Sequence, residues 1–597
     1  MKKNILILMA AGLFCLAACN DIQEIKEITQ PEDSNAPVQM ITETISARVG
    51  NGTTKATING TSGAFSWTEG KDKIAVHTTG GYVLSTTASA SGASTEFTVS
   101  YSGSRDYYAV YPHTLVYNES TSSFISECVA AYGSEYTKQI KVCLPSTYAL
   151  SDIQDNNTIC PMIATNTPES GWSFAQLCGL LRLTIKGIPT GTKSLKVDFN
   201  GMPVSGIFSV YGTTDPIPLY TYKHNSSLYT DYYRIWEGGS GDECYYEDNI
   251  TITGITDQTS VTVNIPLPVS NGASHAYREL MIYACDVDGK PIKAVFQTLS
   301  SYQAARAEGK KVSATLSKEP FSVAYGKYAL IAQSNLKATT TDSWSSWAFS
   351  FMDNPWDIVE TDLGDGTCCT ANYGGQSAVS LFSFATSGIS HKHPNSTSSS
   401  SFDYYAYSNE NFDLDRLGSG DQTRYADWGC NAISNDGINR KGCGWLTPSK
   451  DEWAYLLNTR SATYRYAKAT IHSRNGLIIF PDTFNPTSIG VTITDANTPD
   501  AAFTSYSDDD WTKMANAGCV FLPVTGRRTS VGASDAPTLI DNDWKSSGVY
   551  WSRTINDSGS GKPNAYCIDF KASEINLEMR NMRKYGAAVR LILPVNY

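Results

Sequence analysis

The sequence has few charged residues and, beyond its first 18 residues, no long apolar run. Charged residues make up 17% of the 597 positions, and the net charge is −12. An acidic surface repels nucleic acid and anionic lipid, so we expect neither as a partner. After residue 18 no apolar stretch reaches the roughly 20 residues that a membrane-spanning helix needs.

The motifs of several enzyme and cofactor classes are also missing. The chain contains no G-x-S-x-G, no H-E-x-x-H and no P-loop, which argues against three common classes of hydrolase and nucleotide site. Its 14 cysteines include no C-x-x-C pair with zinc character. His391 and His393 have no acidic or thiol residue close by in the sequence. We therefore expect no metal, no cofactor and no enzyme activity.

The N-terminus has the pattern of a bacterial export signal. Met1-Lys2-Lys3 precede an apolar segment that ends in Leu16-Ala17-Ala18-Cys19. This order resembles a lipoprotein signal, in which the peptidase cuts before the cysteine and the thiol is acylated. The alternative is an ordinary signal peptide with an incidental cysteine. We predict a signal peptide over 1–18, lipidation at Cys19, a tether over 19–38 and a cell-surface location on the outer membrane or a fimbrium.

Export to an oxidising compartment would allow disulfides to form. Cys430 and Cys443 flank a turn-rich segment, and Cys519 and Cys567 each lie in a strand-like run. These two pairs are the candidate disulfides, although cysteine spacing alone does not fix which thiols pair.

Short strands separated by turn residues dominate from residue 39 onward. The 35 Tyr and 46 Gly, with abundant Ser and Thr, suit strands joined by turns better than long helices. Such closely spaced strands are typical of β-sandwiches. Alternating or strand-like runs occupy 40–49, 73–77, 104–112, 140–145 and 179–187.

The order of these runs resembles the fimbrillin family of anaerobic Gram-negative bacteria. The matching pieces are F-x-W-x-x-G-x-x-x-I-x-V from Phe65 to Val76, YYAVYP at 107–112 and LLRLTIKG at 180–187. The resemblance implies two tandem transthyretin-like β-sandwiches, over 39–190 and 191–318. It also implies strand exchange with other fimbrial subunits: proteolysis frees an N-terminal strand, and a neighbour's strand fills the groove. The strand here would be 39–49, with Arg48 and Lys55 as candidate cut sites.

The composition shifts after Pro320, where a third region begins. Nine of the 12 Trp lie beyond residue 340, which favours a core of a few large aromatics. One helix is predicted here, with Thr447 as its N-cap, Pro448 at its first position and acidic residues in its first turn.

Several pieces of this region are similar to the FISUMP-type domain, which is related to the C-type-lectin-like fold. The similarity implies an α+β domain over 326–597, with Trp445, Trp453 and Trp551 in its core. Lectins, phage adhesins and formylglycine-generating enzymes share this fold class, so the fold does not give the function. The matching pieces are GWLTPSKDEW (444–453), NGLIIFPD (475–482), GCVFLPVTGRR (518–528), GVYWS (548–552) and AAVRLI (587–592).

Aromatic residues near polar groups are the candidate ligand-binding positions, because such surfaces suit sugars and proteins. A calcium-dependent sugar site is not expected, since Lys562-Pro563-Asn564 has a lysine where that site needs an acid. The candidates are Tyr404, Tyr405 and Tyr407 in one polar loop, and Asp543, Trp544 and Tyr550 in a later segment.

Three functions remain in competition. The first is a fimbrial tip adhesin that accepts a donor strand from a stalk subunit and presents its C-terminal domain to a glycan or protein receptor on a host or bacterial surface. The second is a stand-alone surface lipoprotein that binds glycans or host proteins. The third is an enzyme of the formylglycine-generating type, for which Cys567 lacks a neighbouring cysteine in the sequence.

Overall fold

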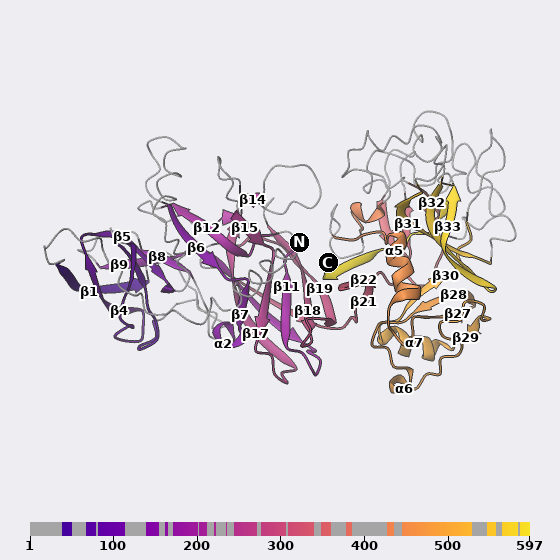
Figure 1. Ribbon diagram of the computed structural model, residues 1–597, viewed down its shortest axis with the longest axis horizontal. Helices are drawn as coiled ribbons and strands as arrows, with labels where there is room; N and C mark the ends of the chain where they lie inside the picture. Colours follow the sequence, from indigo (N-terminus) through magenta and orange to yellow (C-terminus); the bar gives the residue numbers. More distant parts are fainter. Residues whose placement is uncertain are drawn as a thin grey trace, which may run out of the picture.

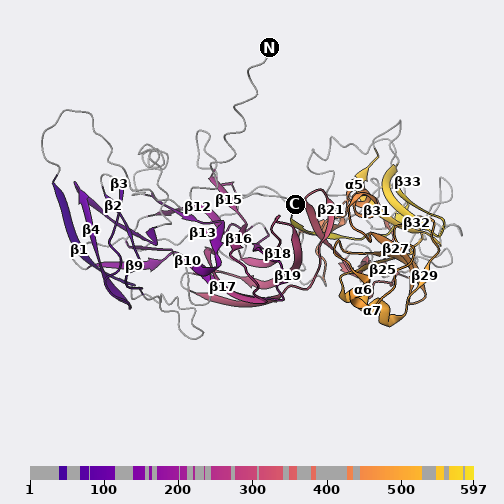
Figure 2. The same ribbon diagram turned by 60° about the horizontal axis from the view of Figure 1, so that its bottom comes forward.

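The structure is a computed structural model of the chain, and it forms a mainly β protein with several separate sheets and a few short helices. Figures 1 and 2 show the sheets in three groups that follow one another along the longest axis of the molecule. No helix in the described part of the chain is long and apolar enough to cross a membrane. The described residues are 39–49, 67–78, 81–113, 139–154, 161–164, 171–200, 202–211, 220–221, 234–235, 244–270, 276–305, 308–339, 348–359, 378–384, 427–434, 444–527, 546–556, 564–582 and 585–596.

The first group is one curled seven-stranded sheet of order β3-β2-β5-β8-β9-β1-β4. Its two ends meet, because Thr86 N–H donates to the Thr98 carbonyl and Thr98 N–H donates to Thr86 Oγ1. Trp67 is buried inside the curl and makes edge-to-face contacts with Phe97, Tyr111 and Phe174. The strands are β1 (Met40–Val49), β2 (Ala75–Thr78), β3 (Gly81–Leu84), β4 (Ser94–Ser102), β5 (Arg105–Tyr111), β8 (Met162–Ala164) and β9 (Trp172–Gln176).

The second group has two main sheets that share one apolar core. One sheet has the order β19-β18-β11-β16-β7 and the other β13-β17-β10-β20, while β6, β12, β15 and β14 form a further sheet beside them. The strands are β6 (Gln139–Leu144), β7 (Thr147–Ala149), β10 (Cys178–Lys186), β11 (Ser194–Asp198), β12 (Ser205–Tyr211), β13 (Tyr220–Thr221), β14 (Arg234–Ile235), β15 (Cys244–Glu247), β16 (Asn249–Thr253), β17 (Ser260–Ser270), β18 (Tyr277–Cys285), β19 (Pro291–Tyr302) and β20 (Gly309–Thr315), with the short helix α2 (Leu150–Ile153).

The border between these two groups differs from the expected border at residue 190. Strand β10 pairs antiparallel with β17 and parallel with β20, so it belongs to the second group rather than the first. Its inward-facing Leu181, Leu183 and Ile185 lie in the core of that group. Strand β7 also pairs with β16 of the second group. The chain therefore enters the second group at β6 and returns to the first with β8 and β9.

The third group is built from several small sheets. Its first hairpin, β21 and β22, is joined by the last strand β35, so the beginning and the end of the group are paired. The strands are β21 (Phe321–Ala324), β22 (Lys327–Ile331), β23 (Leu336–Thr339), β24 (Ala348–Phe351), β25 (Ala378–Val379), β26 (Phe382–Ser383), β27 (Tyr466–Ile471), β28 (Arg474–Ile479), β29 (Thr504–Ser505), β30 (Val520–Pro523), β31 (Gly548–Ile555), β32 (Asn564–Lys571), β33 (Glu574–Met582), β34 (Gly586–Ala587) and β35 (Ile592–Asn596).

The predicted helix exists, but it begins two residues later than expected. Helix α5 (Lys450–Ala454) is capped by Ser449, whose Oγ accepts from the Glu452 N–H while the Glu452 carboxylate accepts from the Ser449 N–H. Thr447 serves a different contact: its N–H donates to Asp427. The other helices are η7 (Trp428–Cys430), η8 (Tyr455–Thr459), α6 (Pro486–Ile489) and α7 (Asp508–Asn516).

Candidate functional site

Strand β1 lies inside the first sheet, between β4 and β9. It pairs antiparallel with β4 over nine residue pairs, from Met40 opposite Ser102 to Arg48 opposite Ser94. Its last three residues also pair in parallel with Trp172–Phe174 of β9. Removal of β1 would therefore leave two facing strand edges with unpaired backbone groups.

The side chains of β1 make specific contacts with the rest of the first group. Ile45 and Ala47 are buried in the core of the first group. The Glu43 carboxylate accepts a hydrogen bond from the Tyr101 hydroxyl at 2.9 Å. On the exposed face, the Thr42 and Thr44 hydroxyls form hydrogen bonds across to β4. A strand in this place thus needs a hydrogen-bond acceptor at the position of Glu43, a large apolar residue at that of Ile45 and a small residue at that of Ala47.

The backbone also approaches closely near the end of β1. Gly171 has a φ of 73°, and a Cβ there would lie 2.7 Å from the Ser46 carbonyl oxygen. Any larger residue at 171 would clash with the backbone of β1 and would also be strained at this positive φ.

The two candidate cut sites differ in their surroundings. Arg48 is exposed, but its backbone is paired with Ser94 on one side and Ser173 on the other. A protease needs an unpaired extended segment, so cleavage at Arg48 would first require β1 to detach from the sheet. Lys55 lies outside the described residues, as does the predicted lipidation site Cys19.

The predicted ligand-binding residues are either outside the described ranges or buried. Tyr404, Tyr405, Tyr407, Asp543 and Trp544 lie outside them.

The expectation that Tyr550 forms part of a binding surface is wrong, because it is fully buried in β31. Its hydroxyl donates to the Pro523 carbonyl at 2.7 Å and accepts from Asn335, and its ring stacks on Phe570. Burial raises the pKa of Tyr550 to about 12.

The predicted disulfide between Cys519 and Cys567 is also wrong. Both are buried free thiols and lie in different core clusters, Cys519 beside Trp511 and Cys567 beside Trp551. Burial raises the pKa of the Cys567 thiol, which keeps it protonated at neutral pH and argues against a role as nucleophile. Cys443 lies outside the described residues, so its pairing with Cys430 stays a prediction.

Two of the three tryptophans expected in the core are there. Trp453 and Trp551 are fully buried, and both indole N–H groups donate to backbone carbonyls, those of Trp551 and Phe382 respectively. Trp445 is only partly buried and lies where the second and third groups meet. No sequence motif predicts that the second and third groups pack against each other here.

The apolar part of the junction joins the outer face of β18 to the last strand of the molecule. Met281 and Tyr283 of β18 pack in one cluster with Leu330 of β22 and with Leu593 and Val595 of β35. The linker between the groups is also tied down, because Lys318 N–H donates to the Ala294 carbonyl and the Ala294 N–H donates back to Lys318. The third group is thus docked on the second rather than tethered to it.

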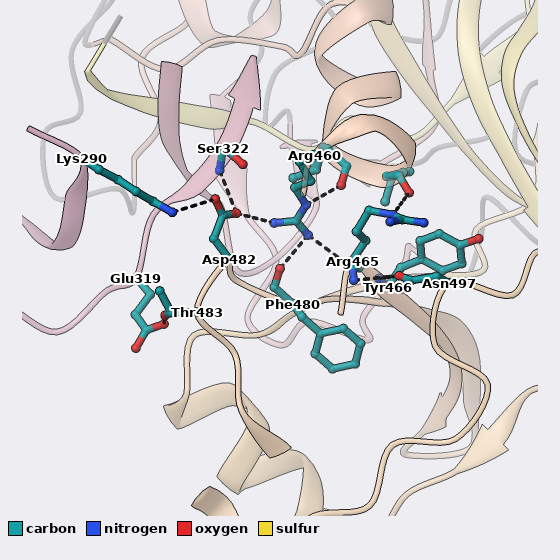
Figure 3. Close-up of polar contacts among 12 residues, drawn as sticks. Lys290, Glu319, Ser322, Arg460, Arg465, Tyr466, Phe480, Asp482, Thr483 and Asn497 are labelled. Carbon is teal, nitrogen blue, oxygen red and sulfur yellow. Dashed lines mark hydrogen bonds and ion pairs between the residues drawn. The ribbon is translucent and has the colours of Figure 1, made fainter. Parts of the chain in front are cut away.

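The polar part of the junction is centred on Asp482, as Figure 3 shows. One carboxylate oxygen accepts from Arg460 at 2.7 Å and from the Ser322 N–H at 3.1 Å. The other lies 3.7 Å from Nζ of Lys290, which comes from the turn between β18 and β19. Asp482 therefore touches the core of the third group, its first strand and the second group.

Arg460 is held almost entirely away from water, with 1% of its side chain exposed. Besides Asp482, it donates to the carbonyls of Leu456, Arg465 and Phe480. Burial lowers the pKa of Arg460, and the adjacent Asp482 carboxylate acts in the opposite direction. The counter-ion and the three carbonyl acceptors together offset the cost of burying this charge.

The chain matches no protein-family model and no curated protein. Among solved structures, it is similar to a candidate cell adhesion protein from Bacteroides ovatus, with 12% identity and a TM-score of 0.27 over 46% of this chain and 91% of the other. A fimbrial protein from the same species has 11% identity and a TM-score of 0.18 over 93% of this chain and 100% of the other.

The tip fimbrial protein Mfa3 from Porphyromonas gingivalis, with a C-terminal truncation, has 11% identity to the chain. Its TM-score is 0.16, over 43% of this chain and 82% of the other. Scores of this size do not establish a shared fold.

Proposed function

We propose that this protein is a cell-surface fimbrial subunit that accepts a donor strand in the place of β1 and presents its third group at the end of a filament. The carrying observation is the contrast between its first and last strands. Strand β1 fills a continuous groove between β4 and β9, while β35 is locked into the third group.

The groove left by β1 would favour an incoming strand for two reasons. The backbone of β4 would lose its partner along nine residue pairs, and buried core residues such as Phe97 and Phe174 would lose the cover of Ile45 and Ala47. A donor strand restores both the hydrogen bonds and the apolar cover, which is the physical basis of strand addition.

The last strand of the chain is a poor donor. Strand β35 pairs with β22, and Ile592 exchanges two hydrogen bonds with Leu446. Leu593 and Val595 also belong to the junction with the second group. Withdrawing β35 would open both the third group and the junction. With β35 held in this way, the third group would lie at the end of the filament and face outward as the adhesive part.

A reversible lock on β1 tests this function. Thr44 and Thr98 face each other across β1 and β4, with their hydroxyls 2.9 Å apart on the exposed face. The double variant Thr44→Cys, Thr98→Cys should form a disulfide that holds β1 in place. The oxidised protein should fail to join filaments made from protease-treated stalk subunits, and reduction should restore joining at filament ends.

The single variant Thr44→Cys is the matched control and should join under both conditions. Incorporation of the oxidised double variant, or incorporation along the filament shaft seen by immunogold labelling of the third group, would refute the proposal. Labelling scattered over the cell body without fibres would favour the alternative of a stand-alone surface lipoprotein that binds glycans or host proteins.

A further inference from the structure

The groove that holds β1 has three inward-facing positions of different chemistry along its length. They are the positions of Glu43, Ile45 and Ala47, which alternate with outward-facing residues because successive side chains of a strand point to opposite faces. Ile45 and Ala47 are buried, and Glu43 is partly exposed. A strand that takes the place of β1 meets all three positions at once.

The first of these positions is polar. Glu43 accepts a hydrogen bond from the hydroxyl of Tyr101 in β4 at 2.9 Å, and the Tyr101 residue is only 6% exposed. A strand with an apolar side chain at this position cannot accept that hydrogen bond, and it loses the corresponding part of the binding free energy. A carboxylate or amide oxygen at this position therefore favours binding.

The other two positions differ in the size of side chain that they accommodate. Ile45 lies opposite Phe97 of β4, and both side chains belong to the buried core of the first group. Ala47 lies opposite Thr95 of β4 on one side and Trp172 of β9 on the other, and both neighbours are buried. Packed cores have little space for additional methylene groups, so a side chain larger than alanine at this position would clash with its neighbours.

The pairing also fixes the direction of the strand. Strand β1 runs antiparallel to β4 over nine residue pairs and parallel to β9 over three. A strand that entered in the opposite direction would place its small residue near Tyr101 and its acceptor near Trp172. The groove therefore distinguishes a sequence from the same residues in reverse order.

We propose that the β1 groove selects a donor strand with three side chains at alternate positions in chain order: a carboxylate or amide, a large aliphatic residue, and alanine or glycine. This inference rests on the proposed function and specifies the partner, which is a stalk subunit whose donor strand has this pattern.

Strand β35 does not have the pattern. One of its faces carries Ile592, Pro594 and Asn596, and the other carries Leu593 and Val595. Pro594 also lacks the backbone N–H that a strand paired on both sides has to donate. The groove thus favours the strand of a different subunit over β35 of a second copy.

Peptide exchange into the full chain tests this selectivity. A recognition site for a sequence-specific protease, inserted after Gly50, allows the link between β1 and the rest of the chain to be cut. A dye-labelled peptide of residues 39–49 then replaces β1, and unlabelled peptides compete with it. Fluorescence anisotropy gives the relative affinities of the competing peptides.

The Glu43→Leu peptide should bind about tenfold more weakly than the parent peptide, whereas Glu43→Gln, which keeps an acceptor oxygen, should stay within about threefold. Ala47→Leu should weaken binding by roughly tenfold or more. Arg48→Leu is the matched control, because it places the same leucine at an exposed position, and it should have little effect. The reversed sequence and a peptide of β35 should not compete.

The protein variant Tyr101→Phe checks the polar position from the side of the groove. In this variant the parent and Glu43→Leu peptides should bind equally, because the hydroxyl that distinguishes them is gone. Near-UV circular dichroism identical to that of the parent protein would show that the variant keeps its packing.

The results separate this inference from the proposed function. Exchange of the parent peptide with equal affinities for Glu43→Leu and Ala47→Leu would overturn the selectivity while leaving strand acceptance in place. Failure of the parent peptide itself to enter the cut protein would overturn strand acceptance, and the selectivity would fall with it.

Discussion

Arg590 is a buried cation that no carboxylate of the described residues neutralises. It is fully buried and donates to Asn335 Oδ1 and to the carbonyls of Ala332 and Phe521, at 2.8–2.9 Å. Burial lowers its pKa to about 10, so the guanidinium stays charged at neutral pH. The planar fork of arginine reaches three acceptors in different strands and loops, which a single ammonium group cannot do.

We expect Arg590→Lys to lower the free energy of unfolding by about 2–4 kcal/mol, because buried acceptors lose their donors and the smaller cation stays desolvated. Denaturant unfolding followed by tryptophan fluorescence measures this change, since most tryptophans lie in the third group. Arg580→Lys is the control, at an exposed position of β33, and should change stability by less than about 0.5 kcal/mol. Similar losses in the two variants would contradict this role of Arg590.

Asp198 makes stability depend on pH. Burial, and then the nearby Asp248 carboxylate, raise its pKa from 3.8 to about 7. A carboxyl group with a raised pKa in the folded state binds its proton more tightly when folded. Its contribution to stability is therefore fully present below pH 4 and is lost as the pH rises through about 7.

The variant Asp198→Asn keeps an oxygen that can accept from the Asn200 N–H but cannot ionise. We expect it to flatten the fall in stability between pH 4 and pH 7 and to be more stable than the parent protein at pH 8, by an amount on the order of 1 kcal/mol. Melting temperatures measured across this range test the effect. Asp257→Asn, at an exposed position, should keep the slope of the parent protein; an unchanged slope in Asp198→Asn would disprove the assignment.

At the scale of single elements, helix α5 is a short segment whose start depends on its cap. Its capping box satisfies two backbone N–H groups at once, through Ser449 and Glu452. We expect Ser449→Ala to destabilise the third group by about 1 kcal/mol. Denaturant unfolding measures it against Ser505→Ala, an exposed serine of β29, which should be close to neutral. A loss below about 0.3 kcal/mol at Ser449 would mean that packing of Trp453 alone holds the helix.

The sequence predicted the elements better than their partners. The run at 40–49 is β1 and the run at 179–187 is β10, nearly to the residue. The sheet to which β10 belongs was missed, because a period of two tells which residues face inward and not which strand lies beside them. Tyr550 was misjudged for a related reason: a strand covered on both faces can carry a buried tyrosine when carbonyl and amide partners meet its hydroxyl.

At the scale of the whole molecule, the junction depends on Asp482. We expect Asp482→Asn to lower the stability of the third group by about 3 kcal/mol, because Arg460 would remain as a buried charge without its counter-ion. Lys290→Gln removes only a partly exposed ion at 3.7 Å and should cost less than about 1 kcal/mol. Denaturant unfolding of both variants separates the two contributions, and a large loss with Lys290→Gln would contradict this division.

The candidate sites were predictable only in part. The proposed role of 39–49 came from a resemblance in sequence, and the structure adds the groove positions that meet Glu43, Ile45 and Ala47. The junction could not be predicted, because Lys290, Asp482 and Trp445 come from distant segments and none stands in a motif for such a contact. Contacts of this kind depend on how the folded groups pack against each other, and local sequence patterns do not predict that packing.

The long ladder between β1 and β4 has a mechanical consequence. In a filament of the proposed kind, a donor strand in the place of β1 leaves the groove along its own axis, so tension on the filament pulls parallel to the strand. All nine residue pairs with β4 then share the load and must shear together, rather than open one after another as in peeling. The hydrogen bonds that hold the donor strand would thus resist force most strongly along the strand axis, which is the direction of tension on the filament of an attached cell.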